Sequence, residues 1–177
     1  LCHTKNNDIC DSSNDDPEHN GLSEFGKNVV TEMNKLGIII DVSHISDKSF
    51  YDVIELTKAP VIASHSSARA ICDNKRNMTD DMLIKLKNNG GVIQMCILSA
   101  YVKTPPENQQ RDDELAALKE KYGPWAEIKD QAIKDKYSEE SYAVKDKYPE
   151  DKATVKDFVD HIDHVVNLIG IDYVGIG

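Results

Sequence analysis

The fold is decided by the stretch Ile38-Ile39-Ile40-Asp41-Val42-Ser43-His44 and the stretch Pro60-Val61-Ile62-Ala63-Ser64-His65. Each is a run of mainly β-branched residues that ends in a histidine, and a segment with helical periodicity lies between them. A strand–helix–strand unit brings the ends of both strands to the same edge of a parallel sheet. We therefore expect His44 and His65 to project together at the carboxyl edge, where α/β enzymes hold their chemistry.

This pair of histidines predicts half of a metal site, because neutral imidazole is the commonest metal ligand in proteins. Two imidazoles favour zinc over magnesium or calcium, which prefer oxygen ligands. The alternative is a pair of polar residues that bond only to neighbouring loops. Asp41, inside the first run, is expected to orient a neighbour rather than to bind metal.

Strand and helix signals alternate along most of the chain, which predicts a parallel α/β fold. The run Val92–Leu98 is almost continuously apolar, so we expect a strand that is buried on both faces. A further strand begins at Tyr173. Residues that can cap the start of a helix precede three of the helical segments, namely Ser23, Ser46 or Asp47, and Thr79. Glycines that can end a helix follow three segments, namely Gly37, Gly90 and Gly170.

Two regions depart from this alternation. Residues 4–20 are polar and rich in turn formers, which predicts a long loop. Residues 103–157 are dense in charges of both signs and poor in aliphatic side chains, and Pro105-Pro106 precedes most of them. We expect a helical, solvent-exposed insertion there rather than part of the core.

Composition limits the class of protein. The 177 residues carry a net charge of −10, which argues against nucleic acid as a partner. The cysteines at positions 2, 10, 72 and 96 lack the spacing of a zinc knuckle, and we expect free thiols, with a Cys2–Cys10 bridge left open. Since the first residues resemble the end of a strand and the last resemble the start of one, we expect a fragment of a larger domain.

Several segments together resemble the membrane (renal) dipeptidase family, peptidase family M19. The match covers most of residues 1–101 and 155–177, and its most specific element is Ser64-His65-Ser66-Ser67-Ala68 followed by Arg76-Asn77. The charged region 103–157 is not diagnostic. The other matching segments are Gly21–Lys27, Leu36–His44, Asn89–Ile93, His161–His164 and Gly175–Gly177.

The resemblance implies an α/β fold, a partial (β/α)8 TIM barrel of the metal-dependent hydrolase type. Residues 1–177 would run from the end of strand four to the start of strand eight, as the C-terminal half of one domain, with 103–157 as its charged insertion. The implied function is a zinc-dependent dipeptidase, with two zinc ions in the complete enzyme, that hydrolyses the peptide bond of dipeptides through a metal-bound hydroxide.

The resemblance also assigns roles to four residues. His44 and His65 match the family's ligands of the second zinc. His3 matches a histidine that binds the substrate or the tetrahedral intermediate, and Arg76 matches the arginine that receives the terminal carboxylate of the dipeptide. The remaining metal ligands would precede Leu1 and the acid/base aspartate would follow Gly177, so no catalytic residue is expected in this chain and the fragment alone is expected to be inactive.

Two other functions stay open. One is another binuclear amidohydrolase acting on a cyclic amide, lactone or phosphoester, although a neutral substrate would not need Arg76. The other is a non-catalytic homologue of the barrel. The sequence leaves a homodimer, the compartment and membrane attachment undecided. Among the further histidines, His19 is expected to be an ordinary residue of the polar loop, and His161 and His164 are expected to lie on a solvated helix face.

Overall fold

The computed structural model describes residues 1–177, which form two compact units. The first unit contains Leu1–Thr104 and Ala153–Gly177, and the second contains Pro105–Lys152. No helix in either unit has both the length and the apolarity needed to cross a lipid bilayer.

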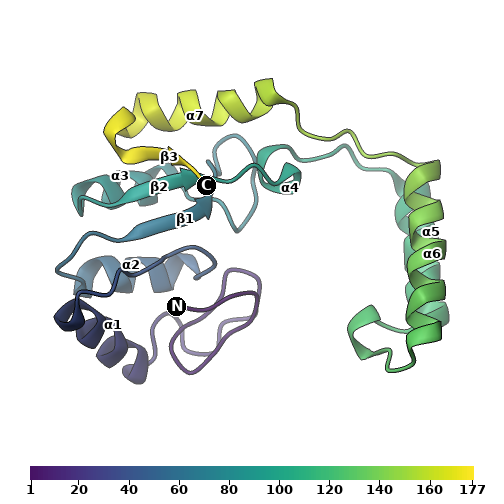
Figure 1. Ribbon diagram of the computed structural model, residues 1–177, viewed down its shortest axis with the longest axis horizontal. Helices are drawn as coiled ribbons and strands as arrows, with labels where there is room; N and C mark the ends of the chain where they lie inside the picture. The colour runs from purple at the N-terminus through teal and green to yellow at the C-terminus, as the bar shows by residue number, and fades with distance from the viewer. The chain divides into compact units, whose positions relative to one another are not determined.

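The first unit is built on a parallel sheet whose strands lie side by side in chain order: β1 (Ile62–Ser66), β2 (Val92–Met95) and β3 (Val174–Ile176) (Figure 1). Beside β1 runs the extended segment around Asp41. The Val42 N–H donates to the Ile62 carbonyl at 2.8 Å and the Ile62 N–H donates to the Ile40 carbonyl at 3.0 Å. Four chain segments therefore end at one edge, as the spacing of the two histidines predicts.

The helices of this unit contact one another in chain order: α1 (Glu24–Leu36) with α2 (Asp47–Leu56), α2 with α3 (Asp80–Asn88), and α3 with α7 (Val155–Ile169). Strands and helices that both follow the chain order form a singly wound α/β wall, the arrangement of a barrel. The short helix α4 (Ser99–Val102) and the 3-10 turn η2 (Ile171–Tyr173) complete the unit.

Local sequence explains these helix boundaries. The side chains of Ser23, Ser46, Thr79 and Thr154 each accept a hydrogen bond from a backbone N–H in the first turn, which satisfies a donor that the helix leaves free. Gly37 ends α1 in the left-handed conformation, at a φ of 69°. The predicted helix starts at Ser23, Ser46 and Thr79 are confirmed.

The sheet buries one face more deeply than the other. Val61, Ala63, Ile93 and Met95 are almost fully buried and belong to the hydrophobic core. Residues between them in sequence are only partly buried. The prediction that Val92–Leu98 is a strand buried on both faces is therefore wrong, because β2 alternates and ends at Met95, and Ile97 and Leu98 are exposed.

Two other predicted strands are not regular. The segment Ile38–His44 pairs only with β1, through a single parallel bridge between Asp41 and Ile62. Leu1–His3, expected to end a strand, contains no strand at all. The physical reason is shared, because a ladder needs backbone hydrogen bonds to a neighbour along several residues. The only hydrogen bonds between these two segments are a weak one from the Leu1 amino group to the Asp41 carbonyl at 3.4 Å and a contact of the Cys2 thiol with the His44 carbonyl at 3.9 Å.

The second unit is a helical hairpin of α5 (Gln109–Tyr122), the 3-10 turn η1 (Trp125–Glu127) and α6 (Gln131–Lys147). Neither long helix buries a side chain. Polar contacts join the two helices instead: Lys121 Nζ lies 2.8 Å from Glu140 and Lys147 Nζ lies 2.6 Å from Glu114. Exposed ion pairs of this kind stabilise only weakly, so the hairpin also depends on the helix propensity of its sequence.

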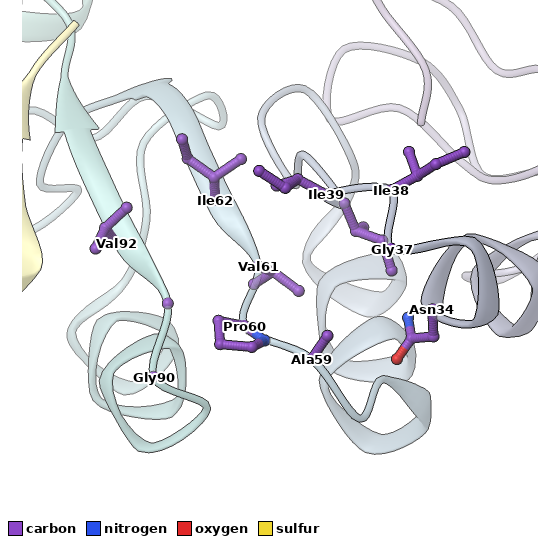
Figure 2. Close-up of a pocket in the computed structure, with 12 residues that line it drawn as sticks. Asn34, Gly37, Ile38, Ile39, Ala59, Pro60, Val61, Ile62, Gly90 and Val92 are labelled. Carbon is purple, nitrogen blue, oxygen red and sulfur yellow. The ribbon is translucent and has the colours of Figure 1, made fainter.

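A cavity of about 420 Å³ opens at the amino ends of β1 and β2 (Figure 2). Its walls are apolar, apart from Asn34, and include Ile39, Pro60, Ile62 and Val92. It contains no residue that can ionise and lies at the opposite end of the strands from His65. Although a large apolar pocket is the usual first candidate for an active site, this one offers no group to perform chemistry.

Gly26 provides a test of how tightly the N-terminal loop packs on α1. A Cβ at Gly26 would overlap the backbone carbonyl of Ile9, which is held in place by the Ser23 N–H at 3.0 Å. Gly26→Ala is expected to lower the free energy of unfolding by about 1–3 kcal/mol, although alanine favours a helix. Urea unfolding measures the change. Thr31→Ala, on the exposed face of the same helix, should stay within about 0.5 kcal/mol of wild type; equal stability of Gly26→Ala and wild type would contradict the packing.

Candidate metal centre

The structure brings His44 and His65 together at the carboxyl edge of the sheet. Their Nε2 atoms lie 2.8 Å apart and their ring centroids lie 4.8 Å apart. Both rings come from the two stretches that define the fold, across 21 residues of chain. The two imidazoles thus lie together as expected, and Nε2 of each ring faces Nε2 of the other.

A β-bulge places the His65 ring. Ala63 pairs with Ile93 whereas Ser66 pairs with Met95, so β1 contains one residue more than β2 over this interval. An extra residue re-aims the side chains beside it. The N–H groups in the bulge donate to side chains instead of to a strand: the Ser64 N–H to Asp41 Oδ1 at 3.2 Å and the His65 N–H to Ser43 Oγ at 3.0 Å.

Asp41 connects this bulge to the His65 ring. Its Oδ1 also accepts the Ser43 N–H at 2.9 Å, and its Oδ2 accepts the Ser64 hydroxyl at 2.6 Å. The same Ser64 Oγ lies 2.7 Å from Nδ1 of His65. Burial opposes ionisation of the carboxyl, but these hydrogen bonds hold the pKa of Asp41 below its usual value. These contacts agree with the expectation that Asp41 orients a neighbour, which stays a prediction.

His44 adopts a strained backbone conformation. Its φ is 74°, in the left-handed region that residues other than glycine seldom occupy. The loop of residues 4–20 holds it there, since its carbonyl accepts the Ser13 N–H at 2.7 Å. Nδ1 of His44 is buried and has no hydrogen-bond partner. Strain of this kind costs on the order of 1–3 kcal/mol and is concentrated at functional sites.

Both imidazoles are held neutral. Burial, followed by the positive charge of Arg76, lowers the pKa of His44 to about 4. The same two causes, in the same order, lower the pKa of His65. A metal ion binds the neutral ring and competes with protons for it, so both rings are in the protonation state that a metal ligand needs.

His3 lies beside His44, with ring centroids 4.2 Å apart, and is exposed. It comes from the loop rather than from a strand. The Ser12 hydroxyl donates to the His3 carbonyl at 2.9 Å, and Ser12 forms a bridge with Ile45. His3 therefore forms part of the wall of the site facing solvent.

Arg76 lies beneath the same group. Its Nη2 donates to the His65 carbonyl at 3.2 Å, and its guanidinium carbon lies 5.3 Å from the centre of the Tyr101 ring. The residue is only 4% exposed, and its buried Nε has no partner. Arg69, on the same loop, differs sharply, because it donates to both carboxylate oxygens of Asp47 at 2.6 and 2.7 Å. Arg69 is fully engaged within the protein, whereas Arg76 retains free donors.

The remaining histidines do not join this group, and one prediction about them is wrong. His161, expected on a solvated helix face, is fully buried. Its Nδ1 accepts the Ala68 N–H at 3.1 Å and its Nε2 donates to the Val102 carbonyl at 2.9 Å, so it connects α7 to the loop at Ala68 and to the end of α4. His164 pairs with Asp80 at 2.8 Å, and His19 bonds to the Asn7 carbonyl.

The donors suit a transition metal, but residues 1–177 contain no complete site. No group of three or more histidine, cysteine, aspartate or glutamate side chains is arranged to hold a metal ion. Two neutral nitrogens that face each other, beside an unpartnered buried nitrogen of His44, match the ligand type that zinc prefers. The chain itself thus offers two ligands, whereas zinc sites in enzymes use at least three protein ligands.

Comparison with known proteins identifies the group to which this arrangement belongs. The family model of the membrane dipeptidases, peptidase family M19, matches residues 1–177. The chain belongs to this family. Dipeptidase tcpJ of Claviceps purpurea is 36% identical over 178 residues, which cover 100% of this chain and 32% of that protein. Dipeptidase 3 of Mus musculus is 48% identical over 92 residues, or 48% of this chain and 19% of that protein.

Solved structures confirm the expected fold of this M19 chain. The probable dipeptidase PvdM from Pseudomonas aeruginosa superposes with a TM-score of 0.78 at 36% identity, covering 100% of this chain and 49% of that one. A metallo peptidase from Rhodobacter sphaeroides, liganded with a phosphinate mimic of the dipeptide L-Ala-D-Ala, gives 0.61 at 25% identity over 89% of this chain and 33% of that one. The chain is a partial barrel, and it spans about a third of the length of the curated relatives that match all of it.

Sequence reasoning missed Ser43, Ser64 and Tyr101. The first two hold the His65 backbone and ring, and the third lies against Arg76. A signal for the serines was available: a carboxylate inside an apolar run must find donors when it is buried, and serines stand two residues after Asp41 and one residue before His65. No comparable signal marked Tyr101.

The pKa of His44 predicts how stability depends on pH in the metal-free full-length protein. Because its folded pKa of about 4 lies below the ordinary histidine value of 6.5, the unfolded chain takes up the proton first as pH falls. Stability is therefore full above about pH 6.5 and decreases toward about pH 4, by roughly 1–2 kcal/mol from this residue at about pH 5. Urea unfolding at about pH 7.5 and about pH 5 measures the decrease.

His44→Asn is the matched variant, since asparagine tolerates a positive φ. Its loss of stability between the two pH values should be smaller than that of wild type. Equal losses would show that His44 is not buried in its neutral form.

Proposed function

We propose that the full-length protein is a zinc-dependent dipeptidase that hydrolyses the peptide bond of dipeptides. The observation that carries the proposal is the pair of neutral imidazoles, with Nε2 atoms 2.8 Å apart, at the carboxyl edge of an M19 barrel wall. Membership of a dipeptidase family supports the reaction, and the ligand chemistry supports the metal.

His44 and His65 are proposed to hold one of two zinc ions through Nε2. When bound, zinc supplies a nucleophile by acidifying water and polarises the carbonyl of the substrate. The other ligands and the acid/base aspartate are proposed to come from parts of the full-length protein outside residues 1–177. No residue of this chain is assigned a proton-transfer step.

His3 and Arg76 are proposed to bind the substrate. The exposed His3 ring lies beside His44, which supports a role in donating a hydrogen bond to an oxygen of the reacting carbonyl. Arg76 has a buried Nε without a partner, and a guanidinium group can bind a carboxylate through two parallel bonds. A fixed distance between this arginine and the metal ligands would select dipeptides over longer peptides.

Residues 103–157 are proposed to form an insertion between barrel strands seven and eight, which correspond here to β2 and β3. The compact unit Pro105–Lys152 lies within these limits and has no long helix with a buried side chain. The strands on either side of it pair directly, with Ile93 opposite Val174. The sheet thus continues without any contribution from the insertion.

The activity can be tested with purified full-length protein. Zinc-loaded protein should hydrolyse free dipeptides, a strong chelator should abolish the activity, and added zinc should restore it. Turnover of a cyclic amide, a lactone or a phosphoester with no turnover of any dipeptide would contradict the proposal.

Arg76→Ala should weaken the use of dipeptides that have a free carboxyl terminus. Losing a charge-assisted pair costs roughly 2–4 kcal/mol, or about 30- to 1000-fold in kcat/KM. The measurement compares a free dipeptide with its C-terminal amide. Wild type should strongly prefer the free acid, and the variant should lose most of that preference.

Arg69→Ala is the control, because it removes an arginine of the same loop that is already bound to Asp47. It should reduce stability but leave the ratio of acid to amide unchanged. If Arg76→Ala also left the ratio unchanged, Arg76 would have a structural role only.

A further inference from the structure

We propose that Asp41 and Ser64 are positioning residues that fix the proton of His65 on Nδ1 and so leave the Nε2 lone pair free toward the metal site. The consequence for metal binding rests on the proposed function. The tautomer itself does not, because it follows from hydrogen bonds within residues 1–177.

The direction of each hydrogen bond follows from the number of protons available. Asp41 Oδ2 accepts the Ser64 hydroxyl at 2.6 Å, and this uses the only proton that the hydroxyl has. Ser64 Oγ can then only accept from the second group beside it, Nδ1 of His65, at 2.7 Å. A neutral imidazole has one N–H, so Nε2 of His65 carries a lone pair.

The Asp41 carboxylate anchors this chain of bonds. Its Oδ1 accepts the Ser43 N–H and the Ser64 N–H, at 2.9 and 3.2 Å. Three donors therefore converge on one partly buried carboxylate, and hydrogen bonds to a charged group are stronger than those between neutral groups. A protonated Asp41 would lose part of these three hydrogen bonds. The hydrogen bonds therefore favour the carboxylate, which can only accept.

The two histidines are not equivalent. Since Nε2 of His65 is an acceptor, the 2.8 Å contact in the absence of metal requires that Nε2 of His44 donates to it. Nδ1 of His44 has no partner, so only the contact with His65 holds the His44 proton on Nε2. His65 is thus preset for a metal ion, whereas His44 must move its proton to Nδ1 or lose it when a metal binds.

Asp41→Asn tests the polarity of this arrangement without removing its shape. Two backbone N–H groups face Oδ1, so the amide oxygen should occupy that position and the amide nitrogen should face Ser64. The amide would then donate to Ser64 Oγ, and the hydroxyl would donate to Nδ1 of His65. The proton of His65 would move to Nε2 and block the metal position, because exchanging a carboxylate for an amide in a hydrogen-bonded histidine relay selects the opposite tautomer.

The first measurement is made on metal-free full-length protein. Long-range ¹H–¹⁵N correlation of the imidazoles, with His65 assigned through His65→Asn, reports which ring nitrogen carries the proton. Wild type should show His65 protonated on Nδ1, and Asp41→Asn should show it protonated on Nε2. Ser64→Thr, which keeps the hydroxyl, should resemble wild type. A wild-type His65 protonated on Nε2 would overturn the proposal.

The second measurement is zinc affinity from competition with a chromophoric chelator. Asp41→Asn and Ser64→Ala should each weaken the binding of one zinc ion by about 10- to 100-fold. Ser43→Ala is the matched control, because its hydroxyl contacts the His65 N–H and not the ring; the tautomer should not change in this variant. If Asp41→Asn failed to fold, Ser64→Ala and Ser64→Thr would provide the same comparison.

The outcomes separate this inference from the proposed function. Wild-type zinc affinity in Asp41→Asn and Ser64→Ala, with active protein, would overturn the positioning role and leave the dipeptidase proposal intact. If the expected tautomers were found in a protein that neither binds zinc nor cleaves dipeptides, the dipeptidase proposal would be overturned and the assigned tautomer of His65 would stand.

Discussion

The site depends on the hydrogen bonds that the partly buried carboxylate of Asp41 accepts. Taking a carboxylate out of water costs several kcal/mol unless donors surround it. Here the Ser43 N–H, the Ser64 N–H and the Ser64 hydroxyl supply them. Because two of these donors belong to the bulge of β1, satisfying the charge also fixes the segment that carries His65. One constraint therefore determines the backbone of the bulge and the orientation of its ring.

The surrounding fold makes this constraint useful. Parallel segments in chain order bring His44 and His65 to one edge, and the layer of helices covers the face of the sheet that contains Ala63 and Ile93. The polar loop then holds His44 at a φ of 74°, and its bonds offset the strain. The buried face of the sheet and the helices packed on it stabilise the fold. The strained and unpartnered groups are concentrated at the carboxyl edge, where a ligand would bind.

Local patterns predicted much of this arrangement. Capping residues such as Ser23 and Thr79 mark helix starts because their effect is local. The strand–helix–strand topology predicts that two histidines at strand ends lie close together. Contacts between distant segments determine the length of β2, the burial of His161 and the bulge at His65. The periodicity of the sequence does not predict such contacts. The partners of Ser64 and Tyr101 were missed for the same reason. A family resemblance supplied the roles of His3 and Arg76, which no spacing within the chain would give.

His44 and His65 are proposed to bind one zinc ion together. The most direct measurement is a crystal structure of the zinc-loaded full-length protein with anomalous data collected on both sides of the zinc absorption edge. We expect an anomalous peak about 2.0–2.1 Å from Nε2 of both His44 and His65. A well-ordered site with no peak between these rings, or with zinc bound only by other residues, would contradict it.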